Sequence, residues 1–344
     1  MTACTVCTTL PGFTAATLLV LIGLALVFDF LNGFHDAANS IATVVSTGVL
    51  RPYQAVAWAA FFNLLAFAIF KLNVAATIGK GILVPEFVDA YVIGSALTGA
   101  IAWNLITWYF GIPSSSSHAL IGGMIGAGMA KAATAPLVWA GIVKTLVFIV
   151  ISPLLGLLLG AAVMIAVSWI FFRRSPYTVD IWFRRLQLLS SALYSVGHGS
   201  NDAQKTMGLI WLMLISSGAA SREHIPLWVV GSSYTAMALG TLFGGWRIVK
   251  TMGQRITKLK AVGGFCAETG GALTLFLATS LGVPVSTTHT ITGAIVGVGS
   301  TQRVSAVRWG VAGNIVVAWI LTLPAAAFIS ATAWWLAKLV LQKS

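Results

Sequence analysis

The chain has 344 residues, of which 58% are hydrophobic and only 8% are charged. Soluble domains carry about 25% charged residues, so this composition cannot cover a surface that faces water. It excludes a cytoplasmic enzyme, a disordered chain and a secreted disulfide scaffold, and it leaves a protein that crosses a membrane several times. The net charge of +12 comes from short basic clusters between apolar runs. These clusters favour cytoplasmic loops over nucleic-acid binding.

Long uninterrupted apolar runs predict membrane helices, because barrel strands would alternate apolar and polar residues over about ten positions. The first run contains Asp29 and has no basic segment before it, so we interpret it as a retained span rather than a signal peptide. The sequence therefore predicts an all-α polytopic membrane protein. In chain order, helical runs of the first half are predicted near 15–31, 38–50, 53–70, 90–110, 114–130 and 137–172.

The second half of the chain repeats two motifs of the first half. Asn-Gly-Phe-His-Asp-Ala at 32–37 aligns with His-Gly-Ser-Asn-Asp-Ala at 198–203, a shift of 166 residues. Gly-Ile-Pro-Ser-Ser-Ser-Ser-His at 111–118 aligns with Gly-Val-Pro-Val-Ser-Thr-Thr-His at 282–289, a shift of 171 residues. Both pairs occur in the same order, which indicates an internal duplication.

The duplication divides the chain into three parts. These are a first repeat with its N-terminal tail (1–172), a basic cytoplasmic linker (173–186) and a second repeat (187–344). Duplicated helical membrane proteins with interrupted helices at equivalent places are typical of secondary transporters. The apolar runs do not fix the number of spans in each half. Analogy with other transporters favours repeats of inverted topology, with broken helices and re-entrant hairpins.

Three cysteines are too few to suggest a disulfide framework. Cys4 and Cys7 form a C-x-x-C pair without a histidine or a second pair beside it, so we interpret them as part of a mobile tail. Cys266 lies in an apolar run and is expected to be packed there. No structural metal site and no cofactor are predicted.

Asp36 and Asp202 are the central acids of the first motif pair. An ionised carboxylate inside a bilayer costs at least about 2.5–3.5 kcal/mol, so each acid must face water or a partner. The glycine beside each acid is expected to let its helix unwind and expose carbonyl groups. Carboxylate, amide and carbonyl oxygens are hard ligands that suit Na⁺ or proton-linked chemistry. The alternative is that both acids only cap the next helical segment. The predicted coupling-cation residues of the two motifs are Asp36, Asn39, Asn32, Asp202 and Asn201.

The second motif pair combines a proline with a run of hydroxyl side chains. Proline suits the first turn of a helix, and the free N–H groups of that turn, with the hydroxyls and the helix dipole, form a cradle for an anion. The alternative is that these hydroxyls only cap or bond back to their own helix. The predicted anion-binding residues are Ser114, Ser115, Ser116, Ser117, Ser286, Thr287 and Thr288.

Several further polar residues accompany these motifs. Glu268 lies in an apolar, glycine-rich run and is a candidate proton carrier or cation ligand, or the partner of a base such as Lys205. Lys205 follows Asp202 by three residues, so it is placed to pair with that acid or to reach the anion. His118 and His289 match between the repeats, and we favour a structural role for them over anion or proton binding. The supporting residues are therefore His35, His118, His289, His198 and Lys205.

Charge links the two kinds of motif. Two unit charges of one sign at 4 Å repel by about 4 kcal/mol even at an effective dielectric constant of 20. Two ionised aspartates and an oxyanion can therefore share a buried cavity only if cations enter with the anion. Coupled symport follows if the motifs lie close together in space.

The motif segments 30–39, 111–123, 197–208 and 282–293 resemble the signature motifs of the inorganic phosphate transporter family, in its bacterial low-affinity form. The resemblance covers nearly the whole chain. It implies phosphate symport with H⁺ or Na⁺, with Na⁺ bound at Asp36 and Asp202, in the cytoplasmic (inner) membrane by a protein with inverted repeats that forms a homodimer. Under this resemblance the hydroxyl turns bind phosphate, and Glu268 is the acid of the second-repeat helix.

Two positions depart from sodium-coupled animal relatives. Those relatives tend to have asparagine before the first Asp and an acid near position 63, where this chain has His35 and Asn63. The departure favours H⁺ coupling, with a neutral metal–phosphate complex as an alternative substrate. A sulfate permease, an uncoupled anion channel and a membrane enzyme are the rival functions. An enzyme is disfavoured because the chain lacks a P-loop or an H-E-x-x-H motif.

Overall fold

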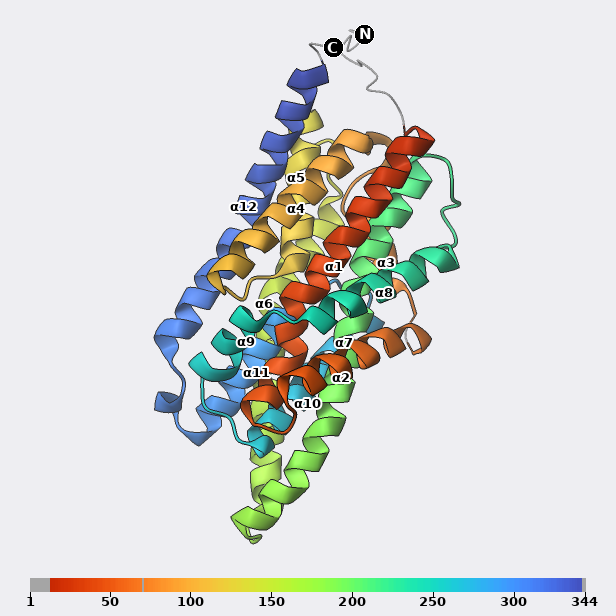
Figure 1. Cartoon of the computed structure of the whole chain (residues 1–344). Coiled ribbons are helices and arrows are strands. Elements are labelled where there is room, and N and C mark those ends of the chain that lie inside the picture. Colours follow the sequence, from red (N-terminus) through yellow and green to blue (C-terminus); the bar gives the residue numbers. More distant parts are fainter. Residues whose placement is uncertain (1–12, 70, 342–344) are drawn as a thin grey trace.

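The computed structural model describes residues 13–69 and 71–341, which form an all-α bundle (Figure 1). The predicted tail with Cys4 and Cys7 lies outside the described residues. The helices of the first half are α1 (Ala15–Ser46), α2 (Pro52–Leu65), η1 (Ala66–Ala68), α3 (Asn73–Gly81), η2 (Pro85–Phe87), α4 (Ala90–Phe110), α5 (Ser116–Ala132) and α6 (Trp139–Phe171). Those of the second half are α7 (Pro176–Ser216), α8 (Leu227–Phe243), α9 (Trp246–Lys250), η3 (Thr251–Arg255), α10 (Ala261–Ser280), α11 (Thr287–Gln302), η4 (Val304–Ala306) and α12 (Trp309–Leu341).

The described residues contain enough long apolar helices for a polytopic membrane protein. Five helices, α1, α4, α6, α10 and α12, are long and apolar enough to cross a bilayer. Two bent pairs, α2 with α3 and α8 with α9, raise the number to seven if each pair forms one span. Large apolar side chains such as Trp169 on α6 and Phe328 on α12 are exposed, as expected where a helix faces lipid.

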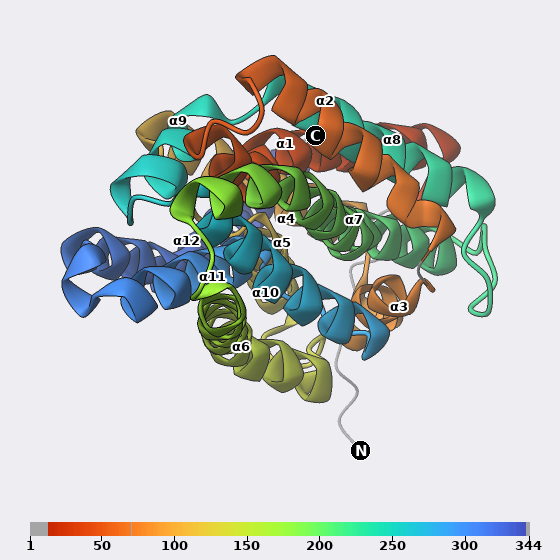
Figure 2. The same cartoon turned by 90° about the horizontal axis from the view of Figure 1, so that it is seen from below.

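Helices of the first half pack directly against helices of the second half. α1 lies against α8 and α7 against α2, while α5 lies against α12 and α11 against α6. Figure 2 shows α2 and α8 along one side of the bundle and α6 on the opposite side, with α10 and α11 between them. The two halves therefore interlock, and each supplies helices that the other half needs for its core.

The helices break at the proline-hydroxyl motifs. Gly111 ends α4 in the left-handed conformation with φ of 66°, and Gly282 follows α10 with φ of 65°. Glycine adopts this conformation without steric cost, and the proline two residues later cannot continue the helix. An extended segment then leads into α5 in the first half and into α11 in the second half. These two interruptions match the broken helices that the sequence predicts.

The expectation that the helices unwind beside the aspartates is wrong. α1 is continuous from Ala15 to Ser46 and passes through Asp36, and α7 is continuous through Asp202. The predicted runs 15–31 and 38–50 are therefore one helix. The glycines of these motifs serve close packing instead. A Cβ atom on Gly33 would lie 2.1 Å from the carbonyl oxygen of Met237 on α8, and one on Gly199 would lie 2.4 Å from that of Asn63 on α2.

The two halves join through a short connection. α6 ends at Phe171 and α7 begins at Pro176, where the Ser175 side chain caps the helix. Most of the predicted linker 173–186 is thus the first turns of α7 rather than a separate loop. In Figure 1 this connection lies at one end of the molecule, and the first turn of α1 and the last turn of α12 lie at the other end.

Candidate functional site

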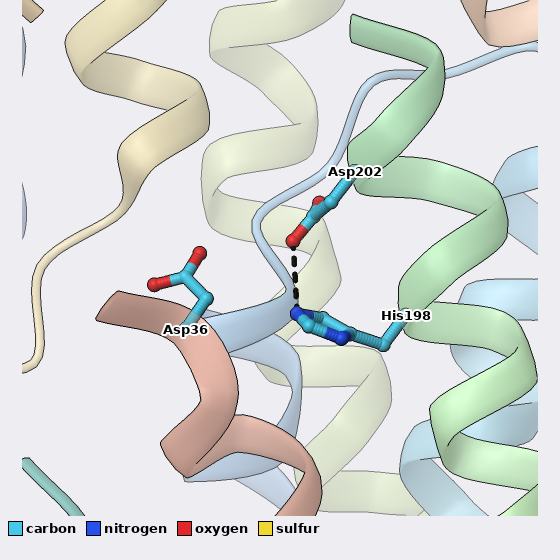
Figure 3. A group of neighbouring side chains, drawn as sticks. All are labelled: Asp36, His198 and Asp202. Atoms are coloured by element: carbon cyan, nitrogen blue, oxygen red, sulfur yellow. Dashed lines mark ion pairs between the residues drawn. The ribbon is translucent and has the colours of Figure 1, made fainter. Parts of the chain in front are cut away.

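Three side chains from both motif copies meet in the middle of the bundle. Asp36 comes from α1, and His198 and Asp202 come from α7 (Figure 3). One candidate ligand atom from each residue lies within 4.8 Å of the other two, and all three residues are buried. His198 Nε2 lies 3.2 Å from Asp202 Oδ2. The cluster offers two carboxylates and an imidazole within reach of one cation.

Lys205 brings a fixed positive charge into this cluster. Its ammonium group forms an ion pair with Asp202 on the same helix. It also donates to Ser117 Oγ at 2.5 Å and to the carbonyl oxygen of Val285 at 2.7 Å. Lys205 is 1% exposed, so its charge acts in a medium of low polarity, where it is screened little. One lysine therefore joins the second Asp motif to both hydroxyl turns.

The hydroxyl turns start the two half-helices. The side chain of Ser115 accepts a hydrogen bond from the His118 N–H at 3.3 Å, and Ser286 accepts one from the His289 N–H at 3.2 Å. Both residues are therefore N-caps, which is the alternative role that the sequence left open. The hydroxyls that follow them belong to the first turns of α5 and α11, where backbone N–H groups are free of helical partners.

α1 contacts the second hydroxyl turn directly. The Asn39 amide donates to Thr287 Oγ1 at 3.1 Å and to Thr288 Oγ1 at 2.9 Å. Thr287 in turn donates to Asp202 Oδ2 at 2.9 Å. Asn201 accepts from the Val285 N–H at 3.2 Å and so holds the segment that leads into α11. The structure thus places Asp202, Asn39, Asn201 and the hydroxyl turn of α11 in one hydrogen-bonded group.

A second group surrounds Asp36. His35 Nδ1 lies 2.8 Å from Asp36 Oδ1, and His35 Nε2 lies 3.1 Å from Thr107 Oγ1 on α4. Ser114 donates to the same Thr107 oxygen at 2.9 Å. The first Asp motif therefore reaches the first hydroxyl turn through His35 and Thr107. Thr107 was not predicted from the sequence.

His118 and His289 meet where the two half-helices begin. Their ring centroids are 4.6 Å apart in an edge-to-face arrangement, and His289 stacks on Trp319 of α12 at 3.8 Å. Both histidines are buried. This packing fits the structural role favoured by the sequence, and that role stays a prediction.

Glu268 lies in a separate network. It accepts hydrogen bonds from Thr43 at 2.6 Å, Gln187 at 3.0 Å and Ser190 at 2.5 Å. The ion pair with Lys205 that the sequence offered as an alternative is absent among the described residues. Glu268 therefore joins α10 to α1 and α7 through neutral donors, and it is fully buried.

Asn32 lies one turn before Asp36, and it neighbours Asp29 rather than the Asp36 cluster.

Gln187, Ser190 and Tyr194 are further partners in this region, and they were not predicted from the sequence. The spacing of polar residues along α7 could have predicted them. The polar residues on α7 recur every three or four positions, which places them on one helix face. They are Gln187, Ser190, Tyr194, His198, Asp202 and Lys205.

Comparison with known proteins identifies the family. The model of the phosphate transporter family matches residues 32–182 and again residues 173–330. The chain belongs to the phosphate transporter family. The double match agrees with the internal duplication, and the nearly complete coverage agrees with the extent of the resemblance.

Individual members of this family are similar to this chain over nearly their whole length. A probable low-affinity inorganic phosphate transporter of Rhizobium meliloti is 63% identical over 321 residues, covering 93% of this chain and 96% of that protein. The Bacillus subtilis protein of the same description is 45% identical, covering 94% and 98%. A solved structure described as a sodium-dependent phosphate transporter matches with a TM-score of 0.84 and 28% identity, covering 94% of this chain and all of that one.

Proposed function

We propose that this protein imports inorganic phosphate across the cytoplasmic membrane as a secondary active transporter that couples uptake to a monovalent cation. Membership of the phosphate transporter family and the descriptions of its relatives support phosphate as the substrate. The observation that carries the coupling is the meeting of Asp36 and Asp202 beside hydroxyl turns from both repeats.

Phosphate would lie between the first turns of α5 and α11. Ser116, Ser117 and Thr288 offer hydroxyl donors there, while the Thr287 hydroxyl donates to Asp202. The free N–H groups of both turns add donors that suit a tetrahedral anion. Lys205 adds one positive charge at the edge of this space. Ser114, Ser115 and Ser286 precede the first helical residues of α5 and α11 and fix the conformation of the turns.

Charge explains why a cation must accompany the anion. Lys205 balances one carboxylate, so an ionised Asp36 and the phosphate remain as an excess of negative charge. Repulsion of about 4 kcal/mol between unit charges at 4 Å disfavours that state. A cation bound by Asp36 and Asp202, with Asn39 and His198 beside them, removes the repulsion. Binding of both ligands would then permit the change between inward-facing and outward-facing states.

Two observations bear on the identity of the cation. The solved relative is described as sodium-dependent, which supports Na⁺. In this chain His35 contacts Asp36 at 2.8 Å, and this histidine replaces the asparagine that is typical of sodium-coupled animal relatives, which supports a proton. Imposed gradients of Na⁺ and H⁺, varied one at a time, decide between them.

The repeats would have inverted topology. α1 starts at the end of the molecule where α12 finishes, whereas α7, the equivalent of α1, starts at the opposite end (Figure 1). Opposite directions of equivalent helices support inversion and an alternating-access mechanism. A homodimer and a neutral metal–phosphate complex as substrate stay predictions from the family resemblance.

Transport into proteoliposomes tests the proposed function. Asp36→Asn and Asp202→Asn should each abolish gradient-driven accumulation of radiolabelled phosphate, because an amide cannot carry the charge that holds the cation. Asp180→Asn is the matched control, since Asp180 is an exposed acid paired with Arg184 on α7. Normal accumulation in both site variants would overturn the assignment.

A further inference from the structure

A groove beside α12 lies outside the coupling site. It has a volume of about 430 Å³ and runs between α12, η3 and the break that follows α4. Residues 111–113 of that break line it, and they lead into the first hydroxyl turn. The α12 residues that line it recur every three or four positions, so they share one helix face. They are Val311, Asn314, Ile315, Val317, Ala318 and Leu321.

Most of the groove is apolar and open to the surroundings of the bundle. Phe110, Val317 and Leu321 line it, and each is more than half exposed. α12 is long and apolar enough to cross a bilayer, and the step from Val311 to Leu321 covers about 15 Å of helix. This length is half of the hydrocarbon core of a bilayer, which is about 30 Å thick. The groove therefore has the length of one leaflet, which a single acyl chain spans.

The polar residues of the groove gather at one end. Arg255 of η3 and Asn314 of α12 are both exposed and line it there, and no acid is among its described lining residues. Arg255 forms no ion pair within the part of the chain that the structure describes. Trp309, the first residue of α12, is 51% exposed, and tryptophan is enriched where a membrane meets water. This end of the groove therefore lies at the level of lipid headgroups.

Two further bases flank the same end. Arg247 packs against Gly111, and the Arg308 N–H donates to the carbonyl oxygen of Ile256, the residue after Arg255, at 2.9 Å. Both arginines are exposed. Basic loops of this kind predict the cytoplasmic side of a membrane protein. The groove thus combines an apolar channel with a concentration of positive charge at its mouth.

We propose that this groove binds an anionic phospholipid, with its headgroup phosphate at Arg255 and Asn314 and one acyl chain along Phe110, Val317 and Leu321. Guanidinium groups match phosphate oxygens in geometry and charge. Basic pockets between membrane helices on the cytoplasmic side are suited to anionic headgroups. The inference does not depend on which cation drives transport.

The lipid would brace the segment that carries the first hydroxyl turn. Thr251 of η3 donates to the Gly111 carbonyl oxygen at 3.0 Å, and the Trp319 ring of α12 donates to the Pro113 carbonyl oxygen at 3.1 Å. Both donors belong to elements that form the walls of the groove. A lipid that fills the groove holds these walls in place, so it should stabilise the folded protein.

Lipid retention by the purified full chain tests this site. Protein in detergent is titrated with phosphatidylglycerol or with phosphatidylcholine of the same acyl chains, and native mass spectrometry measures the bound lipid. Phosphatidylglycerol should bind roughly fivefold more tightly and raise the unfolding temperature further. Arg255→Gln should remove both differences and leave the lipid-free protein as stable as before, because Arg255 has no ion pair to lose.

Arg174→Gln is the matched control, because Arg174 is an exposed base in the connection between α6 and α7 and does not line the groove. It removes the same charge and should keep the preference for phosphatidylglycerol. An equal loss of preference in both arginine variants would overturn the proposal, since general attraction between charges would then explain the binding.

A third variant tests the apolar part of the groove. Ala318→Leu fills space beside Val317 without changing the charge, so it should lower the amount of phosphatidylglycerol retained. Inorganic phosphate in excess should leave the lipid bound, because it offers no acyl chain. Displacement of the lipid by inorganic phosphate, or unchanged retention in Ala318→Leu, would overturn the lipid site. Separation of a dimer by Ala318→Leu at unchanged retention would assign the groove to a second copy of the chain instead.

Discussion

The Asn39 amide donates a hydrogen bond to Thr288 at 2.9 Å, which ties the helix of the first Asp motif to the hydroxyl turn of the second repeat. The two residues are 249 positions apart. Symport requires contacts of this kind, because binding at the cation site must change the affinity of the anion site, and shared side chains can couple the two.

The threonines of the α11 turn should be needed for phosphate affinity. Both variants keep the side-chain shape: Thr288→Val removes a hydroxyl donor to the anion, and Thr287→Val removes the hydroxyl that ties the turn to Asp202. We therefore expect the half-saturating phosphate concentration to rise roughly threefold to tenfold for each. Initial rates of uptake over a range of phosphate concentrations measure this. Thr290→Val is the matched control, because the Thr290 hydroxyl is bonded to the Ser286 carbonyl of its own helix at 2.9 Å. Equal behaviour of all three variants would contradict the anion cradle.

Lys205 should be needed for both stability and transport. Lys205→Met leaves the buried Asp202 carboxylate without its lysine partner, and breaking a buried ion pair costs about 3–5 kcal/mol. The double variant Lys205→Met with Asp202→Asn removes both charges and should regain much of the lost thermal stability without regaining uptake. Thermal unfolding of detergent-purified protein and phosphate uptake, measured side by side, separate the two effects. If the double variant is no more stable than Lys205→Met, the pair does not act as described.

Close helix packing at the first Asp motif should not tolerate an added methyl group. Gly33→Ala would bring its Cβ to 2.1 Å from the Met237 carbonyl oxygen, so α1 and α8 would have to separate. We expect poor folding or a clearly lower unfolding temperature. Gly23→Ala is the control on the same helix, because nothing lies within 4 Å of a Cβ there, and it should be neutral or slightly stabilising. Similar stability of the two variants would argue against this packing.

Glu268 should act as a link between helices. It accepts from donors on α1 and α7, so Glu268→Gln turns part of an acceptor into a donor and should cost about 1–3 kcal/mol. Glu86→Gln is the control, because Glu86 is an exposed acid paired with Arg222, where a pair is worth little. Equal unfolding temperatures for the two variants would show that the Glu268 network contributes nothing to stability.

The amino-acid sequence predicts the fold class and the paired motifs because both depend on local patterns. Apolar runs give the helices, and the repeated Gly111 and Gly282 mark the breaks before the hydroxyl turns. The continuity of α1 through Asp36 was not predictable from the residues beside that acid. It depends on packing against α8, where Gly33 permits an approach that no local pattern reveals.

The partners of the site residues were also beyond sequence reasoning. Thr107 contacts His35, which is 72 positions away, and Thr43 bonds to Glu268, which is 225 positions away. Such pairings follow from how the two repeats interlock, and a single sequence does not specify this. The polar residues on one face of α7 could be predicted from their spacing, and they would have indicated Gln187 and Tyr194 as neighbours of the site.

The most direct test of the account measures phosphate accumulation in proteoliposomes that contain the unaltered protein. With an imposed inward gradient of the coupling cation, radiolabelled phosphate should rise inside above its equilibrium level, and the rise should vanish when that gradient is dissipated. Entry that stops at equilibrium whichever cation gradient is imposed would contradict coupling at Asp36 and Asp202, and would make the protein a passive anion pathway.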